Sequence, residues 1–256
     1  MFWQSTNPKA KSNCEFILMK IAAVQLNMVQ CVNETQFYNL INDIVKEAVA
    51  NKSEVVAFPE DLGFCLAWAK ESFAVQQIRN NIDPSMETFG AKTLIERVFD
   101  YIISKIKLNK MGEWLAQKRI AAIFKRTFQK VSENNKIVII SGSIYESRLT
   151  GIYNISYVYD NGKLCGTYAK KKLVPIEISW GVKSGNDNKP IKTSVADVGL
   201  VICYDLDDPK FIKEMVSNGA QFIVAPSGGW RPYPDYPFDK SKEQPQIARS
   251  IENQMR

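Results

Sequence analysis

The 256-residue sequence predicts a single α/β domain built on mixed β-sheets. Short apolar runs alternate with segments of helical periodicity, and one stretch has the pattern of a β-hairpin. Alternating strands and helices are typical of parallel sheets, whereas a hairpin adds antiparallel neighbours. Because no linker or internal repeat divides the chain, we expect one domain over 19–256, preceded by a disordered extension over 1–18.

The first apolar runs predict a βαβ unit. KIAAVQLNM (20–28) and EVVAFPED (54–61) are expected to be buried strands, because their apolar residues are nearly continuous. Between them Asn33 is a candidate helix N-cap, with Gln36 three residues later, and apolar residues follow at helical spacing up to Val49. Strand, helix and strand in this order predict two parallel strands.

Residues 84–135 are expected to form a helical insertion with a basic face. Apolar pairs recur every four residues from Leu94 to Ile106, and a second helix is expected over 114–131, which contains Lys and Arg but no acidic residue. A basic face could contact a membrane surface or an acidic partner, but a solvated helix face is the simpler interpretation. Membrane contact is therefore not favoured, and no apolar run approaches the roughly 20 residues of a membrane span.

The second half of the chain alternates in the same way, with a hairpin added. The hairpin is expected over 152–170, because Asn161-Gly162 is a typical two-residue turn. The other expected elements are strands over 136–146, 198–205 and 221–227, and helices over 209–219 and 244–255.

The composition excludes several classes of catalytic site. The chain contains no histidine, so it can form neither a Ser-His-Asp triad, nor a Cys-His pair, nor an H-E-x-x-H zinc site. Its five cysteines are scattered without a C-x-x-C pair, which is typical of reduced thiols in a cytoplasmic protein. We expect no metal, no cofactor and no nucleic-acid partner, and a general base that is Asp, Glu, Lys or Tyr.

Three segments carry candidate catalytic side chains. In GLVICYDLDDP (199–209), Cys203 ends an apolar strand before a helix, a place where ligands bind in α/β sheets and where a thiolate is favoured. Glu60 ends the strand in FPED and could serve as a base, with Asp61 as the nearest competitor. YAKKKLVPIE (168–177) adds lysines that could stabilise an oxyanion. Taken singly, these residues are better explained as a buried thiol, a helix N-cap or surface acid, and a solvated basic turn.

The order of the motifs resembles the carbon–nitrogen hydrolase (nitrilase) superfamily, in its amidase-like or apolipoprotein N-acyltransferase-like branch. The resemblance covers about 20–256 and rests on AVQLN, FPE, YAKKKLVP, GLVICYDLDDP, GAQFIVAPS and RSIENQ. It implies an α-β-β-α sandwich with mixed sheets. Since the chain stops soon after RSIENQ, the C-terminal strands of that sandwich are possibly lacking.

The resemblance also implies roles for individual residues. Cys203 would be the nucleophile, Glu60 the base, Lys170 the cation that stabilises the tetrahedral intermediate, and Glu177 an accessory glutamate. The substrate-binding residues would be Tyr204, through its backbone N–H, Trp180 and Trp230. The reaction would hydrolyse a non-peptide amide C–N bond through a cysteine thioester, without a cofactor.

Two departures and two alternatives accompany this hypothesis. Lys172 stands where many relatives carry histidine, and Cys203-Tyr204-Asp205 replaces the C-W-E of nitrilases proper, which favours amides over nitriles. The same thioester could instead acylate an amine, which would make the protein an N-acyltransferase. A truncated, inactive subunit or interaction protein is the other alternative. By resemblance we expect a small-molecule amide substrate and a homo-oligomer.

Overall fold

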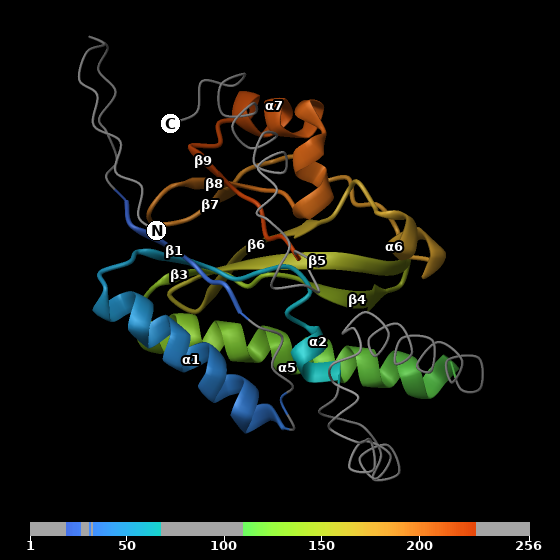
Figure 1. The fold of residues 1–256 in the computed structure, drawn as a ribbon, viewed down its shortest axis with the longest axis horizontal. Helices are drawn as coiled ribbons and strands as arrows, with labels where there is room; N and C mark the ends of the chain where they lie inside the picture. Colours follow the sequence, from blue (N-terminus) through green and yellow to red (C-terminus); the bar gives the residue numbers. More distant parts are fainter. Residues whose placement is uncertain (1–18, 27–30, 32, 68–109, 229–256) are drawn as a thin grey trace, which may run out of the picture.

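The protein is a four-layered sandwich of helices and sheets. The computed structural model describes residues 19–26, 31, 33–67 and 110–228. Helices α1 (Glu34–Ala50) and α5 (Lys110–Asn135) cover one face of a large sheet, and a smaller sheet lies on its other face (Figure 1). Helix α7 (Pro209–Ser217) covers the outer face of the smaller sheet (Figure 1). The predicted α-β-β-α arrangement with mixed sheets is therefore confirmed.

The large sheet has six strands. They are β1 (Ile21–Ala23), β2 (Val55–Ala57), β3 (Val138–Ile140), β4 (Ile144–Arg148), β5 (Gly151–Asp160) and β6 (Lys163–Ala169). β1, β2 and β3 are parallel, as the βαβ pattern predicts. β5 pairs antiparallel with β3 and β4 and with β6, which follows it through the predicted hairpin. Asn161 and Gly162 in its turn both have positive φ, which a two-residue hairpin of this type requires.

The small sheet contains β7 (Ile191–Lys192), β8 (Asp197–Leu200) and β9 (Phe222–Val224), with β8 and β9 parallel. Between the two sheets lies one hydrophobic core, and between the large sheet and its helices lies another. Val55 belongs to the core between the sheets, and the next residue, Val56, to the core under the helices. This explains why the strand runs are continuously apolar: the large sheet is buried on both faces.

Helix α1 begins where the sequence predicts. The Asn33 side chain accepts a hydrogen bond from the Gln36 backbone N–H at 2.9 Å. Helix α5 starts before the expected residue 114 and buries Phe124, Phe128 and Val131 beside α1. Among the described residues, no helix combines the length and apolar composition that a membrane crossing requires.

Two strand predictions are wrong in detail. The strand expected over 136–146 is divided into β3 and β4, because Gly142 takes a φ of +71 and lets the chain bend. A Cβ at Gly142 would lie 2.1 Å from the Pro59 carbonyl oxygen, so only glycine fits beside that turn. The strand expected over 198–205 ends at Leu200, and a 3₁₀ helix, η3 (Cys203–Asp207), follows.

Several predictions lie outside the described residues. They are the extension over 1–18, the helices expected over 94–106 and 244–255, and the first part of the insertion expected over 84–135.

Candidate active site

Four of the predicted catalytic residues come together at the ends of elements in both sheets. Glu60 lies shortly after β2, and Lys170 follows directly on β6. Glu177 belongs to the short helix α6 (Pro175–Ser179), and Cys203 begins η3 after β8. The strands are short and apolar, and the polar residues start where the apolar runs stop. Ligand sites in α/β proteins form at such strand ends.

Lys170 is the centre of this cluster. Its Nζ lies 2.8 Å from Glu60 Oε1 and 2.9 Å from Glu177 Oε2. All three side chains are almost sealed from solvent, with exposed fractions of 2%, 5% and 1% for Lys170, Glu60 and Glu177. Burial alone would lower the pKa of Lys170, but the two carboxylates raise it above its usual value. The lysine is therefore held as an ammonium ion.

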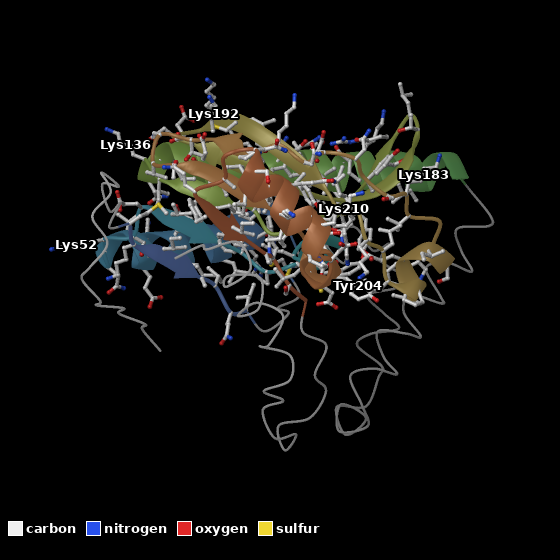
Figure 2. All side chains as sticks on the ribbon, turned by 90° about the horizontal axis from the view of Figure 1, so that it is seen from above. Lys52, Lys136, Lys183, Lys192, Tyr204 and Lys210 are labelled. Carbon is white, nitrogen blue, oxygen red and sulfur yellow. The ribbon has the colours of Figure 1, made fainter. Side chains whose placement is uncertain are left out.

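This position contrasts with that of several exposed lysines in the described part of the chain. Lys52, Lys136 and Lys192 extend outward from the surface of the molecule (Figure 2). An ammonium group away from water requires paired charges or hydrogen bonds, which Glu60 and Glu177 supply.

Asn154 joins the two carboxylates. It lies on β5, fully buried, and its Nδ2 donates to Glu60 Oε1 at 3.1 Å and to Glu177 Oε1 at 2.9 Å. Tyr145 on β4 donates to the same Glu177 oxygen at 3.1 Å, and the Val174 backbone N–H donates to the other at 2.9 Å. The sequence interpretation missed Asn154 and Tyr145. The feature that could have indicated Asn154 is its amide side chain inside a largely apolar strand.

The Cys203 backbone is held in an unusual conformation. Its φ is +47, in the left-handed region that residues other than glycine seldom adopt, and its N–H donates to the Pro226 carbonyl at 2.9 Å. Such backbone strain is found preferentially at functional sites.

The Cys203 thiol is protonated at rest. Burial and the negative charge of Glu60, to which the thiol is hydrogen-bonded, raise its pKa to about 12, although Lys170 opposes this. The expectation that the position before a helix favours a thiolate is thus wrong for the resting protein. The physical reason is that η3 is a single 3₁₀ turn, whereas the Glu60 carboxylate is in direct contact. The geometry supplies an acceptor for the thiol proton instead.

Asp61 is a third acid in the same cluster. It is buried with φ +62, and among the described residues its Oδ1 has no hydrogen-bond partner. Burial, then the charge of Glu60, raise the pKa of Asp61 well above its usual range. Lys170 forms its ion pairs with Glu60 and Glu177, so the geometry favours Glu60 over Asp61 as the base.

Gly228 closes the site from the segment after β9. Its backbone N–H donates to Glu60 Oε2 at 2.9 Å, and a Cβ at this position would lie 3.2 Å from the same oxygen. Glu60 therefore has fixed partners on both oxygens: Lys170 and Asn154 on Oε1 and Gly228 on Oε2. The sequence interpretation did not single out Gly228, whose signal was the glycine pair directly after GAQFIVAPS.

The three predicted substrate-binding residues fall in different places. Tyr204 follows the nucleophile candidate directly, is half-buried, and has the Lys172 ammonium 4.3 Å from its ring centroid; Figure 2 labels it. Trp180 ends α6 and packs edge-on against Tyr145, with ring centroids 5.8 Å apart. Trp230 lies outside the described residues.

Comparisons with known proteins point to one family. A family model described as carbon–nitrogen hydrolase matches residues 20–255. The deaminated glutathione amidase of Dictyostelium discoideum is 23% identical over 257 residues, which cover 94% of this chain and 74% of that protein. The probable hydrolase YhcX of Bacillus subtilis is 20% identical over 209 residues, which cover 81% of this chain. The match spans only 34% of that relative, about a third of its length.

Solved structures share the fold. A variant of the amidase from Nesterenkonia sp. AN1, in which acrylamide has added to the active-site cysteine, aligns with a TM-score of 0.60. The alignment covers 93% of this chain and 76% of that one at 16% sequence identity. At this identity the likeness concerns the fold alone.

Proposed function

Because the chain belongs to the carbon–nitrogen hydrolase family, we propose that it is an amidase in which Cys203 attacks a small-molecule amide. One observation carries the proposal: Glu60 and Glu177 bracket the buried Lys170 ammonium, and the Cys203 thiol is hydrogen-bonded to Glu60. A nucleophile, a base and a fixed cation are the three groups that acyl transfer through a thioester needs.

In the first half-reaction the Cys203 sulfur attacks the amide carbon as the thiol proton passes to Glu60. The C–S bond forms, the carbonyl oxygen becomes an oxyanion, and the protonated Glu60 then gives its proton to the nitrogen. The C–N bond breaks and the amine leaves, which produces a thioester on Cys203. A thiol with a pKa of about 12 needs such a coupled proton transfer, because hardly any thiolate exists near neutral pH.

Lys170 is suited to stabilise the oxyanion. An ammonium group has three N–H donors, and Glu60 and Glu177 engage two of them. Among the described residues the third donor has no such partner, so it is the proposed donor to the substrate oxygen, and the backbone N–H of Tyr204 is the proposed second donor. Removing one donor of this kind typically lowers kcat by about 10²–10³-fold. Glu177 acts here through Lys170, whose position it fixes together with Asn154.

In the second half-reaction water attacks the thioester. Glu60 takes a proton from the water as the C–O bond forms, and the C–S bond then breaks with return of the proton to sulfur. The product is the free acid. Two similar proteins support a small amide as substrate: one is a deaminated glutathione amidase, and the other is the Nesterenkonia amidase, in a variant of which acrylamide has added to the active-site cysteine. An amine in place of water would give N-acyl transfer by the same steps.

The test measures ammonia and free acid released from a panel of small primary amides. We expect turnover in the full chain, none above background in Cys203→Ala, and wild-type rates in Cys165→Ala, which removes a half-buried thiol far from the cluster. Glu60→Gln should lower kcat by about 10²–10⁴-fold. A Cys203→Ala protein that still hydrolyses amides would overturn the proposal. Added hydroxylamine tests for acyl transfer in addition to hydrolysis, since a hydroxamate product shows that an amine can take the acyl group in place of water.

Thiol reactivity gives a test that needs no substrate. Iodoacetamide should alkylate Cys203 about tenfold or more faster than Cys165 near neutral pH, because Glu60 accepts the proton as the sulfur reacts. Glu60→Gln should remove this advantage. Equal rates at the two cysteines in the wild-type protein would contradict the role of Glu60.

A further inference from the structure

Asp205 is a buried carboxylate that none of the proposed steps uses. Its side chain is 0% exposed and accepts four hydrogen bonds. Oδ1 accepts from the backbone N–H groups of Lys171 at 3.1 Å and Lys172 at 2.6 Å. Oδ2 accepts from the Ile202 backbone N–H at 3.0 Å and from the Tyr168 hydroxyl at 2.9 Å.

The donors belong to the two segments that carry the catalytic groups. Lys171 and Lys172 directly follow Lys170, and Ile202 directly precedes Cys203. Asp205 and Lys171 are 34 positions apart in sequence, so the carboxylate joins segments that the chain itself does not hold together. One oxygen holds the lysine segment, and the other holds the cysteine segment.

We propose that Asp205 is a positioning residue that locks the Lys170 segment to the Cys203 segment and so sets the distance between ammonium and sulfur. The inference rests on the proposed function, because it assigns Asp205 a role in the same reaction. The four hydrogen bonds of Asp205 go to backbone N–H groups and to the Tyr168 hydroxyl, not to the sulfur or the ammonium, so its effect passes through the backbone. The strained φ of Cys203 needs such support from its neighbours.

The charge of Asp205 argues against a role in stability alone. Within the described part of the chain, neither of its oxygens forms an ion pair: Lys171 Nζ lies 3.8 Å from Glu214, and Lys172 Nζ lies over the Tyr204 ring. Burial raises the pKa of Asp205, although its four hydrogen bonds oppose this. A buried carboxylate without a cation is an expensive way to stabilise a fold.

Asparagine is the decisive substitution, because it has the same shape as aspartate but carries one acceptor oxygen and one donor NH₂ group in place of two acceptor oxygens. If its Nδ2 occupies the place of Oδ1, it faces the fixed N–H groups of Lys171 and Lys172. If it occupies the place of Oδ2, it faces the fixed N–H of Ile202, while Tyr168 can turn its hydroxyl to accept. Either orientation releases one of the two segments.

The test compares Asp205→Asn with two controls. Asp207→Asn makes the same change at an exposed position of η3, and Tyr168→Phe removes one hydrogen bond but leaves both backbone segments attached. We expect Asp205→Asn to lower kcat about 10²-fold with KM changed less than about threefold, because a small misplacement of reacting groups has this effect. The Cys203 alkylation rate should fall in parallel, and both controls should stay within about threefold of wild type.

Two results would overturn the proposal. An Asp205→Asn protein that melts at a lower temperature but keeps its kcat and its alkylation rate would show a structural role only. The second result comes from hydrogen exchange in the wild-type protein. This measurement tests whether Asp205 joins the two segments even if the variant does not fold. Amide protons of Lys171, Lys172 and Ile202 should exchange slowly and open together. Unprotected Lys171 and Lys172 amides beside a protected Ile202 would show that the two segments are not joined.

The alkylation and exchange measurements do not require amide hydrolysis. Absence of turnover in the wild-type protein would therefore refute the proposed function without deciding the role of Asp205.

Discussion

Replacing Glu177 by glutamine would remove one of the two carboxylates that bracket the Lys170 ammonium. Glu177 Oε2 accepts from Lys170 Nζ and from the Val174 N–H, both at 2.9 Å, and Oε1 accepts from Asn154 and Tyr145. Whether the glutamine NH₂ group takes the place of Oε1 or of Oε2, it would face at least one hydrogen-bond donor that cannot act as an acceptor instead. On the Oε1 side this donor is the Asn154 amide, and on the Oε2 side both donors are fixed.

The magnitude follows from these contacts. Breaking a buried ion pair entirely costs about 3–5 kcal/mol, but Lys170 keeps its second partner, Glu60. Losing hydrogen bonds to a charged group costs about 1.5–3 kcal/mol. We therefore expect the free energy of unfolding to fall by about 3 kcal/mol. At about 2–4 °C for each kcal/mol in a chain of this size, the melting temperature should fall by about 6–12 °C.

The assay is urea denaturation at 25 °C and thermal unfolding of the wild type, Glu177→Gln and a matched control. Glu214→Gln is that control: the Glu214 side chain is 32% exposed and lies 3.8 Å from the Lys171 ammonium, and a partly exposed pair at this long distance should contribute about 0–1 kcal/mol. Amide turnover should fall about 10²-fold in Glu177→Gln, because Lys170 loses its fixed position. A Glu177→Gln protein as stable and active as Glu214→Gln would refute the reasoning.

Three further predictions concern single positions. Gly142→Ala should lower the free energy of unfolding by about 2–4 kcal/mol, because its Cβ would meet the Pro59 carbonyl. Gly181→Ala is the control: Gly181 also has a positive φ but has open space around it, so this change should cost about 1 kcal/mol. Equal losses for the two variants in urea titrations would contradict the prediction. Asn33→Ala should cost about 1 kcal/mol through loss of the α1 N-cap, measured in the same titrations; an unchanged midpoint would contradict the cap. Because the pKa of Asp61 is raised on folding, the wild type should lose stability as pH rises from about 4 toward that raised pKa. Asp61→Asn should remove this loss, and parallel stability–pH curves for the two proteins would exclude it.

The apolar runs predicted the strands of the large sheet because burial on both faces leaves a clear pattern, whereas the order of the layers came from the family resemblance. The runs around Val55 and Val138 are continuously apolar, which indicates strands covered on both sides. The same continuous apolar pattern made it impossible to locate the end of the strand before Cys203 from the sequence. VGLVICYD is apolar up to the cysteine, and local propensity does not reveal that Asp205 captures the Ile202 N–H and turns the chain into η3.

Only those residues of the site that lie at strand ends could be predicted from the sequence. Glu60, Lys170 and Cys203 follow apolar runs directly, so their types and order could be interpreted. Asn154 could not be placed in the same way, because its partners are 94 and 23 positions away and no local pattern links them. Gly228 donates through its backbone N–H, which every residue except proline has, so its residue type does not reveal its role.

The charges of the cluster explain why its nucleophile is neutral at rest. Glu60, Glu177 and Asp61 share the single ammonium of Lys170 in a volume almost sealed from water. Two carboxylates beside one ammonium already leave one negative charge in excess, so a third ionised acid or a thiolate would add an uncompensated charge. Burial and these neighbouring charges therefore raise the pKa of both Asp61 and Cys203. An attack on a carbonyl group removes the obstacle, since the proton moves to Glu60 while the negative charge moves to an oxygen that Lys170 can stabilise. On this argument the buried charges favour a thiol that gives up its proton only as its sulfur attacks an electrophile.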